Sequence, residues 1–574
     1  MKSKLALCAA AGLLLMGAAP LPSPAYDLLI RNAEIYDGSG GAPLKGEVAV
    51  KGDRIAYVGP HAPGRGARAI DAHGQAVAPG FINMLSWANE SLVADGRGLS
   101  DLKQGVTLEV MGEGNSMGPL TPEMKAYETR HQGDIKFPID WTSLDEYLRG
   151  LEKRGVSLNV ASFVGAETVR VHELGADDVQ PTPEQLDRMR GLVRQAMLDG
   201  AMGVGSSIIY APGSYAKTDE LAALTEEAGK CGGIYISHMR SEGDRLLEAV
   251  DELIAISAAS GTPAEIYHLK ASGKGNWDKL DTAIARIEAA RAKGQRITAD
   301  MYTYPAGSTG LDAAMPTWVQ AGGVEEWIKR LRDPAIRAKV VAEMRLDHPN
   351  FENLARQAGG DGTLLVGFKN PALKPLTGKT LAEVAKARGT SAEDTAIDLV
   401  IEDGSRVQVV YFLMSEANVA KETKIPWVSF GSDAAAMAPE GVFLLSSTHP
   451  RAYGNFVRVL GKYARDEKTL TVAEAVRRLS AQPAHNLGLH DRGLLKAGYF
   501  ADIVVFDPAT VTDHATFEKP QQLATGVSDV VVNGQLALAD GEPTAARPGR
   551  VVRGRGWTGW PDGGCRASAK AWSW

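Results

Sequence analysis

Short segments of alternating apolar and polar residues open and close the chain. They cover residues 27–36 and 46–59 near the start and 498–507 and 527–534 near the end, with Gly and Asp turns between them. Isolated hairpins are only marginally stable in water. We therefore expect the two ends, residues 26–78 and 484–553, to pair into one small β domain.

Between these ends, buried-strand patterns alternate with helical patterns. Strands are expected at 106–111, 157–163, 233–237, 264–267, 296–299 and 427–430, and segments rich in Ala, Leu, Glu and Arg, such as 183–198 and 244–259, separate them. Repeated strand–helix alternation over this length predicts a parallel α/β barrel, here residues 79–483. Residues 311–410 break the rhythm with charged helix formers, and we expect them to be an insertion that covers the barrel mouth as a lid.

The first 25 residues have the pattern of a secretory signal peptide. Lys2 and Lys4 precede an apolar run over residues 5–16, and small residues follow as far as Ala25. We therefore expect a periplasmic or secreted protein with no stable membrane span once the signal is removed. No other stretch is long and apolar enough to cross a bilayer.

Composition excludes some classes of partner and of stabilisation. The chain of 574 residues has 62 basic and 69 acidic residues, a formal net charge of -7, and no basic run, so nucleic acid is not an expected partner. After signal removal only Cys231 and Cys565 would remain, too few for a disulfide framework. Stability must therefore come from a large core.

Two histidines stand at the ends of expected barrel strands. His238 follows Tyr-Ile-Ser, and His268 follows Glu-Ile-Tyr. Strand C-termini face the active site in such barrels, and neutral imidazoles on neighbouring strands are good zinc ligands. The alternative is that both histidines only cap their strands.

The sequence Ala-Pro-Gly-Phe-Ile-Asn-Met-Leu-Ser-Trp at 78–87 resembles the first-strand motif of the amidohydrolase superfamily. In most members of that family an Asp and two His occupy the positions of Asn83, Leu85 and Trp87. Two histidines at that spacing leave a strand on one face and can reach one metal. The scaffold signal is thus present, while part of the family's metal site is replaced.

Further motifs resemble the N-acyl-D-amino-acid deacylase (D-aminoacylase) branch of that superfamily, and the resemblance covers roughly residues 26–553. They are the segments 200–203, 206–213, 237–240, 268–270, 300–309, 431–433 and 449–454. Each is weak alone, and their shared order makes the match specific. The resemblance implies a TIM-like (β/α)8 barrel, a β-sandwich domain built from both chain ends, and a zinc-dependent hydrolase.

The resemblance also implies the metal ligands. The family holds its firmly bound zinc with a cysteine and two histidines, which correspond here to His238 and His268. The cysteine position falls on Gly114, with Glu113 beside it. A carboxylate can complete a catalytic His-His-carboxylate set, so we expect one zinc per chain held by Glu113, His238 and His268. The alternative is that Glu113 is a solvated loop residue and metal binding is weak or lost.

The remaining site residues also follow from the resemblance. Asp433 matches the aspartate that moves the proton from water to the leaving amine; its alternative role is a helix N-cap. A small-molecule substrate with a free carboxylate would be bound by Lys270, Arg451, Tyr210, Tyr302 and Ser308. The alternative for the two cations is a surface salt bridge.

We therefore expect zinc-dependent hydrolysis of the amide bond of N-acyl-D-amino acids. Two alternatives stay open: another metal-dependent amidohydrolase, acting on a D-dipeptide or a cyclic amide, and a non-catalytic binding protein on the same barrel. Replacement of two family histidines by Leu85 and Trp87 favours the binding protein, whereas His238, His268 and Asp433 favour an enzyme. The sequence leaves open the oligomeric state and the role of the Trp-rich tail, residues 554–574.

Overall fold

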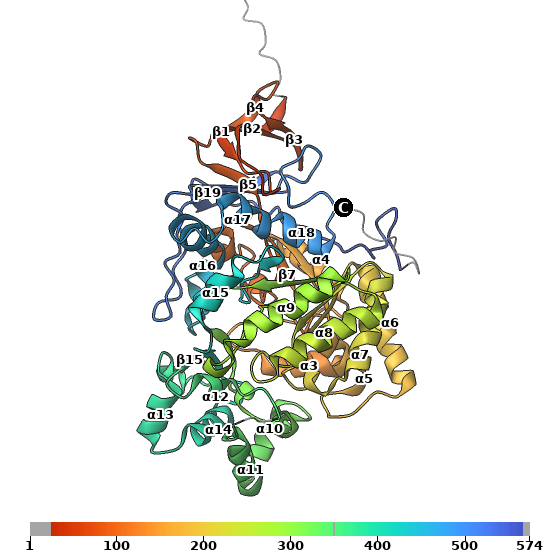
Figure 1. Ribbon diagram of the computed structural model, residues 1–574, viewed down its shortest axis with the longest axis vertical. Helices are drawn as coiled ribbons and strands as arrows, with labels where there is room; N and C mark the ends of the chain where they lie inside the picture. Colours follow the sequence, from red (N-terminus) through yellow and green to blue (C-terminus); the bar gives the residue numbers. More distant parts are fainter. Residues whose placement is uncertain (1–24, 348–349, 566–574) are drawn as a thin grey trace, which may run out of the picture.

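The computed structural model describes residues 25–347 and 350–565 (Figure 1). The predicted signal peptide therefore lies outside the described residues except for Ala25. A nine-stranded sheet stands at one end of the molecule, in the strand order β21-β20-β19-β18-β5-β1-β2-β3, with β4 also paired to β1. Its strands are β1 (Tyr26–Ile35), β2 (Leu44–Lys51), β3 (Arg54–Gly59), β4 (Gly66–Asp71), β5 (Ala76–Pro79), β18 (Ile503–Phe506), β19 (Val527–Val532), β20 (Gln535–Ala539) and β21 (Glu542–Pro543).

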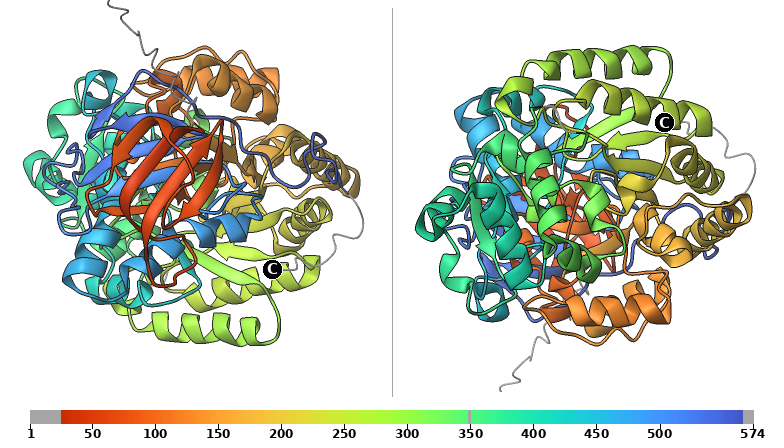
Figure 2. Two further views of the ribbon diagram at one scale, coloured as in Figure 1. Left: turned by 90° about the horizontal axis from the view of Figure 1, so that it is seen from above. Right: turned by 90° about the horizontal axis from the view of Figure 1, so that it is seen from below.

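This sheet unites the two chain ends. β5 and β18 are antiparallel neighbours, with Pro79 opposite Ile503 and Ala76 opposite Phe506. Figure 2 shows the strands from both ends side by side above the barrel. One face of the sheet buries a separate apolar cluster that includes Ile30, Val48 and Val531. The prediction that both ends build one β domain is confirmed, while its exact boundaries stay a prediction.

A closed parallel barrel follows below the sheet. Its strands are β6 (Phe81–Asn83), β7 (Val106–Met111), β8 (Asn159–Ser162), β9 (Val164–Gly165), β10 (Gly203–Ser207), β11 (Ile234–His238), β12 (Ala264–Ile266), β13 (Ile297–Met301) and β17 (Val428–Phe430). Phe163 alone separates β8 from β9, so the two count as one strand and the barrel has eight. The ring closes between β17 and β6: Met84 N donates to Phe430 O at 3.4 Å, and just beyond the two strands Asp433 N donates to Leu85 O at 2.9 Å. The predicted (β/α)8 barrel is confirmed.

Helices surround the barrel, and local sequence sets their ends. In α6, Thr182 forms a capping box with Gln185, Pro183 occupies the first turn, and Gly200 ends the helix in the left-handed region. The helices before the insertion are α1 (Ser91–Ala94), α2 (Leu99–Leu102), α3 (Pro122–His131), α4 (Leu144–Arg154), α5 (Ala166–Leu174), α6 (Pro183–Asp199), α7 (Thr218–Lys230), α8 (Leu246–Ser260) and α9 (Lys279–Ala292). Those after it are α15 (Glu416–Glu422), α16 (Arg451–Arg458), which continues as a π-helix over Val459–Asp466, α17 (Val472–Leu479) and α18 (Ala481–Leu487).

The predicted insertion is present between β13 and β17. Its core is an antiparallel sheet in the order β14-β16-β15, formed by Gly307–Gly310, Gln408–Tyr411 and Thr363–Gly367. Its helices are α10 (Val324–Leu331), α11 (Pro334–Met344), α12 (Leu354–Ala358), α13 (Leu381–Arg388) and α14 (Ala392–Asp403). It lies on the side of the barrel opposite the nine-stranded sheet (Figures 1 and 2). A lid motion of this insertion stays a prediction.

The chain after β21 runs back along the end of the barrel where the strands begin. Val160 N donates to Arg550 O at 3.0 Å, and Gly554 N donates to Gly200 O at 2.8 Å. Cys565 then forms a disulfide with Cys231, 334 residues earlier in the chain. The described part of the Trp-rich tail is thus fixed to the barrel by a covalent bond. Within the described residues, no helix combines the length and apolarity needed to span a membrane.

Candidate metal centre

Glu113, His238 and His268 converge at the ends of three barrel strands. Glu113 Oε1 lies 3.0 Å from Nδ1 of His238 and 3.2 Å from Nε2 of His268. All three side chains are buried, and in the described part of the chain they are the one cluster of metal-ligating groups, with ligand atoms within 4.8 Å of one another. The structure therefore brings the three predicted ligands together.

The donor set fits a zinc ion. Three ligand atoms about 2.0–2.1 Å from one zinc stand roughly 3.3 Å apart in a tetrahedron, close to the two distances at Glu113 Oε1. Two imidazoles and one carboxylate are also a known catalytic zinc set that leaves a position for water. Each group has its ligand atom directed at the same small volume.

The backbone around Glu113 explains why the carboxylate comes from this position. Gly112 and Gly114 have φ of 104° and 67°, in the region that favours glycine. A Cβ at Gly114 would stand 2.7 Å from Oε2 of Glu167 and 2.7 Å from Cβ of Ser207. The position aligned with the family cysteine therefore has no room for a side chain, and the neighbouring Glu113 reaches the histidines instead.

A second carboxylate stands behind the histidines. Glu242 Oε1 lies 2.9 Å from Nδ1 of His268, the ring nitrogen that faces away from Glu113, and its Oε2 lies 3.7 Å from Nε2 of His238. An outer carboxylate of this kind usually orients metal-bound histidines. Here the Lys270 ammonium contacts both Glu242 Oε1, at 2.6 Å, and His268 Nδ1, at 2.7 Å, so carboxylate, ammonium and ring form one cluster. Glu242 was not among the predicted site residues; its spacing of four residues from His238 is the signal that could have found it.

Charge in this cluster favours a cation. Burial and Lys270 lower the pKa of His268, yet the carboxylates of Glu242 and Glu113 outweigh them and raise it to about 10. Burial raises the pKa of Glu113, but the two facing imidazoles hold it below its usual range. The carboxylates that hold a proton on His268 would stabilise a divalent ion in the same place.

Asp433 lies beside this centre, on the loop after β17. Its φ of 49° is uncommon for a residue other than glycine and is fixed by the bond from its N–H to Leu85 O. Its Oδ2 pairs with Nη1 of Arg451 at 2.7 Å. Burial raises the pKa of Asp433, and Arg451 acts against this rise. Asp433 is thus a constrained, partly charge-compensated carboxylate rather than a helix N-cap.

Leu85 and Trp87 differ sharply in environment. Leu85 is fully buried in an apolar cluster, whereas Trp87 is 38% exposed at the site. Trp87 Nε1 lies 3.0 Å from Glu113 Oε2 and 3.1 Å from Asp433 Oδ1. Trp87 therefore connects Glu113, the candidate metal ligand, to Asp433, the candidate base. From the sequence, this position indicated only that a family histidine had been replaced.

Asn83, at the third replaced position, lies beneath the site. Its Nδ2 lies within hydrogen-bond distance of Asp101, Glu109 and Ser432, at 3.0, 2.9 and 2.8 Å, and its Oδ1 accepts from Ser432 N at 2.8 Å. Burial raises the pKa of both Asp101 and Glu109. Asn83 thus ties β6 and β7 to the loop that carries Asp433 and serves as a structural anchor.

The predicted substrate-binding residues surround the same centre. Tyr302 lies between two cations, with Arg451 4.4 Å and Lys270 5.5 Å from its ring centroid. Lys270 and Arg451 are both buried, at 5% and 3% exposure, so neither forms a surface salt bridge. The Lys270 ammonium contacts Glu242 at 2.6 Å and His268 Nδ1 at 2.7 Å.

Tyr210 and Ser308 complete the predicted set on the side of the insertion. The Tyr210 ring centroid lies 5.4 Å from that of His238, and Arg406 of the insertion lies 5.0 Å from the Tyr210 centroid. Ser308 donates its hydroxyl to Val409 O at 2.9 Å, while its carbonyl accepts from Arg451 Nη2 at 3.3 Å. The hydroxyl proton of Ser308 is thus already hydrogen-bonded to the backbone of the insertion. The roles assigned to these residues stay predictions.

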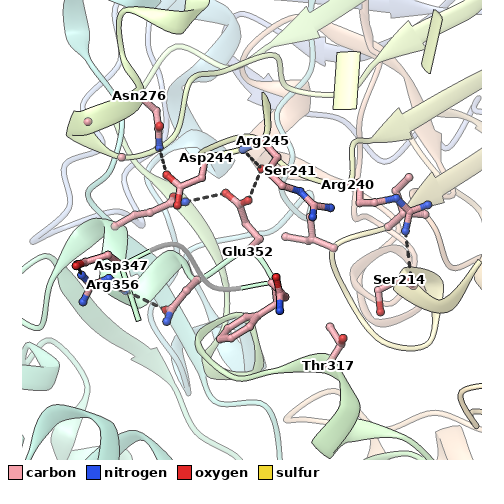
Figure 3. Close-up of a pocket in the computed structure, with 18 of the residues that line it drawn as sticks. Ser214, Arg240, Ser241, Asp244, Arg245, Asn276, Thr317, Asp347, Glu352 and Arg356 are labelled. Atoms are coloured by element: carbon pink, nitrogen blue, oxygen red, sulfur yellow. Dashed lines mark hydrogen bonds and ion pairs between the residues drawn. The ribbon is translucent and has the colours of Figure 1, made fainter. Parts of the chain in front are cut away.

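A polar cavity of about 440 Å³ lies next to the centre, between the barrel and the insertion (Figure 3). Ser241 belongs to its lining and is adjacent in sequence to Glu242; its hydroxyl donates to Oε2 of Glu352 at 2.6 Å. Burial raises the pKa of Glu352 to about 7. Arg240 and Arg245 also line the cavity, which the sequence did not predict.

Known proteins share this sequence and architecture. The amidohydrolase family model matches residues 68–537. D-aminoacylase of Alcaligenes xylosoxydans xylosoxydans is 31% identical over 534 residues, 92% of this chain and 98% of the relative. N-acyl-D-glutamate deacylase of the same organism is 31% identical over 535 residues, covering 92% and 96% of the two chains.

Solved structures agree with the sequence matches. The crystal structure of D-aminoacylase superposes with a TM-score of 0.76 at 29% identity, covering 92% of this chain and all of that one (100%). N-acyl-D-glutamate deacylase from Bordetella bronchiseptica, solved with zinc and a phosphonate inhibitor, gives 0.76 at 28% identity, with coverage of 92% and 99%. The family match over most of the chain, together with this shared fold, shows that the chain belongs to the amidohydrolase family, in the group that contains D-aminoacylase and the N-acyl-D-amino-acid deacylases.

Proposed function

We propose that this protein hydrolyses the amide bond of N-acyl-D-amino acids, with one zinc ion held by Glu113, His238 and His268. The observation that carries the proposal is the convergence of these three groups within hydrogen-bond distance, beside the carboxylate of Asp433. The relatives named D-aminoacylase, N-acyl-D-glutamate deacylase and N-acyl-D-aspartate deacylase, at 31–32% identity, support this substrate class.

A zinc ion bound there supplies Lewis acidity to the amide carbonyl and lowers the pKa of a bound water. The other steps fall to the chain. Asp433 takes a proton from the attacking water and gives it to the leaving nitrogen, so amide and water become a carboxylate and a free amine. Its raised pKa suits a group that must both accept and release a proton.

Recognition of the substrate carboxylate falls to the cations around Tyr302. Arg451 presents a planar guanidinium that can bind a carboxylate with two parallel bonds, and Lys270 adds a buried positive charge. Because both are buried, an anion brought to them is shielded from water. This charge favours an acyl amino acid over a neutral cyclic amide as the substrate.

The test is hydrolysis of N-acetyl-D-amino acids and their L-enantiomers by purified protein loaded with zinc. We expect turnover of D-substrates, poor turnover of L-substrates, and a marked loss of turnover when the substrate carboxylate is amidated. Equal turnover of the amidated substrate would favour a different amidohydrolase substrate. Zinc-loaded protein that hydrolyses no N-acyl amino acid would favour the binding-protein alternative.

We also propose that the protein is exported to the periplasm or secreted. The Cys231–Cys565 disulfide supports this, because such bonds persist in oxidising compartments. N-terminal sequencing of the protein from a periplasmic fraction tests the proposal. A mature chain that starts near residue 26 is expected, and an intact chain found only in the cytosol would contradict it.

A further inference from the structure

Trp87 makes a contact that no other described residue makes: it joins the two carboxylates on which the site depends. Its indole nitrogen lies 3.0 Å from Oε2 of Glu113 and 3.1 Å from Oδ1 of Asp433. The other oxygen of Glu113 faces the histidines, and the other oxygen of Asp433 faces Arg451. The Trp87 N–H is therefore shared between one carboxylate oxygen of Glu113 and one of Asp433.

The indole N–H suits this position in two ways. It is a neutral donor, so it reduces the repulsion between two like charges without adding a charge of its own. It also has no lone pair to offer a metal, and Leu85, two residues earlier, is buried in an apolar cluster. The volume between the two carboxylates is thus closed to a second cation, for which two carboxylate oxygens would otherwise be suitable ligands.

We propose that Trp87 is a positioning residue, whose N–H fixes Asp433 relative to the zinc ligand Glu113 and occupies the place of a second metal ion. The inference rests on the proposed function, because Asp433 is given the role of proton carrier. A base held by a fixed donor keeps one orientation during turnover, without dependence on a second ion.

The first experiment compares Trp87→Phe with the wild type at matched zinc content. Phenylalanine keeps the ring and removes the N–H, so kcat should fall about ten- to a hundredfold, the size expected for a lost hydrogen bond to a charged group, while KM changes little. Trp318→Phe is the matched control, because Trp318 also donates to a carboxylate, Oε2 of Glu343 at 2.9 Å, but within the insertion. That variant should retain wild-type kinetics.

A double-mutant cycle separates positioning from a merely structural role. In the Asp433→Asn background, Trp87→Phe should cause little further loss, since the group it positions is already disabled. A full additional loss would mean that Trp87 acts elsewhere. Unchanged kcat in the single Trp87→Phe variant would likewise overturn the proposal.

The second experiment does not depend on activity. Zinc titration followed by elemental analysis should give one ion per chain for the wild type and for Trp87→Phe, and two for Trp87→His, whose imidazole joins the two carboxylates as a ligand. A Trp87→His protein that binds no more zinc than the wild type would contradict the proposed place of the second ion. If the wild type hydrolyses no N-acyl-D-amino acid, the proposed function fails, whereas the zinc counts still test the place of Trp87.

Discussion

The buried guanidinium of Arg451 and the half-buried carboxylate of Asp433 form an ion pair in which Nη1 lies 2.7 Å from Oδ2. The residue proposed to receive the substrate carboxylate is therefore already bound to the residue proposed to move the proton. A substrate carboxylate must compete with Asp433 for the same guanidinium. Binding of the substrate carboxylate to Arg451 and release of Asp433 from Arg451 are thus linked.

Replacement of Arg451 by Gln should alter binding and pH dependence together. Burial raises the pKa of Asp433 and Arg451 lowers it, so loss of the arginine should raise that pKa further. Because the base acts in its deprotonated form, the acid limb of the kcat profile should move to higher pH, and KM should rise. Steady-state kinetics across pH measure both. A higher KM with an unmoved acid limb would show that Arg451 only binds substrate.

Asp433→Asn should retain zinc and fold but lose turnover. A positioned proton carrier typically contributes about a hundred- to ten-thousandfold, so we expect a loss of at least about a hundredfold. Turnover and metal content should be measured on the same preparations. An Asn variant as active as the wild type would mean that another group moves the proton.

His268→Ala should remove both metal and activity, because one of three ligands is lost together with the ring that contacts Glu242. Wild-type protein should contain one zinc per chain, a chelator should abolish hydrolysis, and added zinc should restore it. Elemental analysis before and after chelation provides the measurement. Two equivalents of tightly bound zinc in the wild type would refute the single-site assignment.

Glu242→Gln should weaken zinc binding without removing a ligand. Loss of an outer carboxylate typically costs about 10–100-fold in metal affinity or activity. Glu352→Gln is a suitable control, since Glu352 is half-buried beside this segment but bonds Ser241 and Gln357 rather than a histidine. Competition with a chromophoric chelator measures both affinities. Equal affinities for the two variants would remove Glu242 from the metal centre.

Replacement of Cys231 and Cys565 by Ser should lower stability and leave catalysis unchanged. The disulfide closes a loop of 334 residues and fixes the end of the chain to the barrel, so its loss should cost about 2–5 kcal/mol. Denaturant unfolding of the oxidised and the substituted protein gives the difference. A changed kcat would show that the bond also supports the site.

Much of the fold could be predicted because its signals are local. Residues 106–111, for example, form a strand in which all six residues are buried, as is usual for a strand of a parallel barrel. The pairing of the two ends followed from the instability of lone hairpins. The path of residues 549–565 along the barrel could not be predicted, because its backbone bonds and its disulfide depend on distant segments with no pattern of their own.

The site was predictable only where chemistry shows in the sequence itself. His238 and His268 are visible at strand ends, and Glu113 is the nearest carboxylate to the family cysteine position. Glu242 and Trp87 belong to the site only because of the direction in which their side chains point. Trp87, for example, contacts Asp433, which lies 346 residues away in the sequence. Periodicity cannot give such contacts, which depend on how the loops leave the strands.

The pairing of β5 with β18 also sets an order of events for folding. Strand β5 ends at Pro79, and its neighbour β18 starts only at Ile503, so this strand pair cannot form until residues 503–506 have been made. Contacts this distant in sequence form late and slowly. A chain arrested before β18 would expose the unpaired edge of β5, which residues 503–506 later cover.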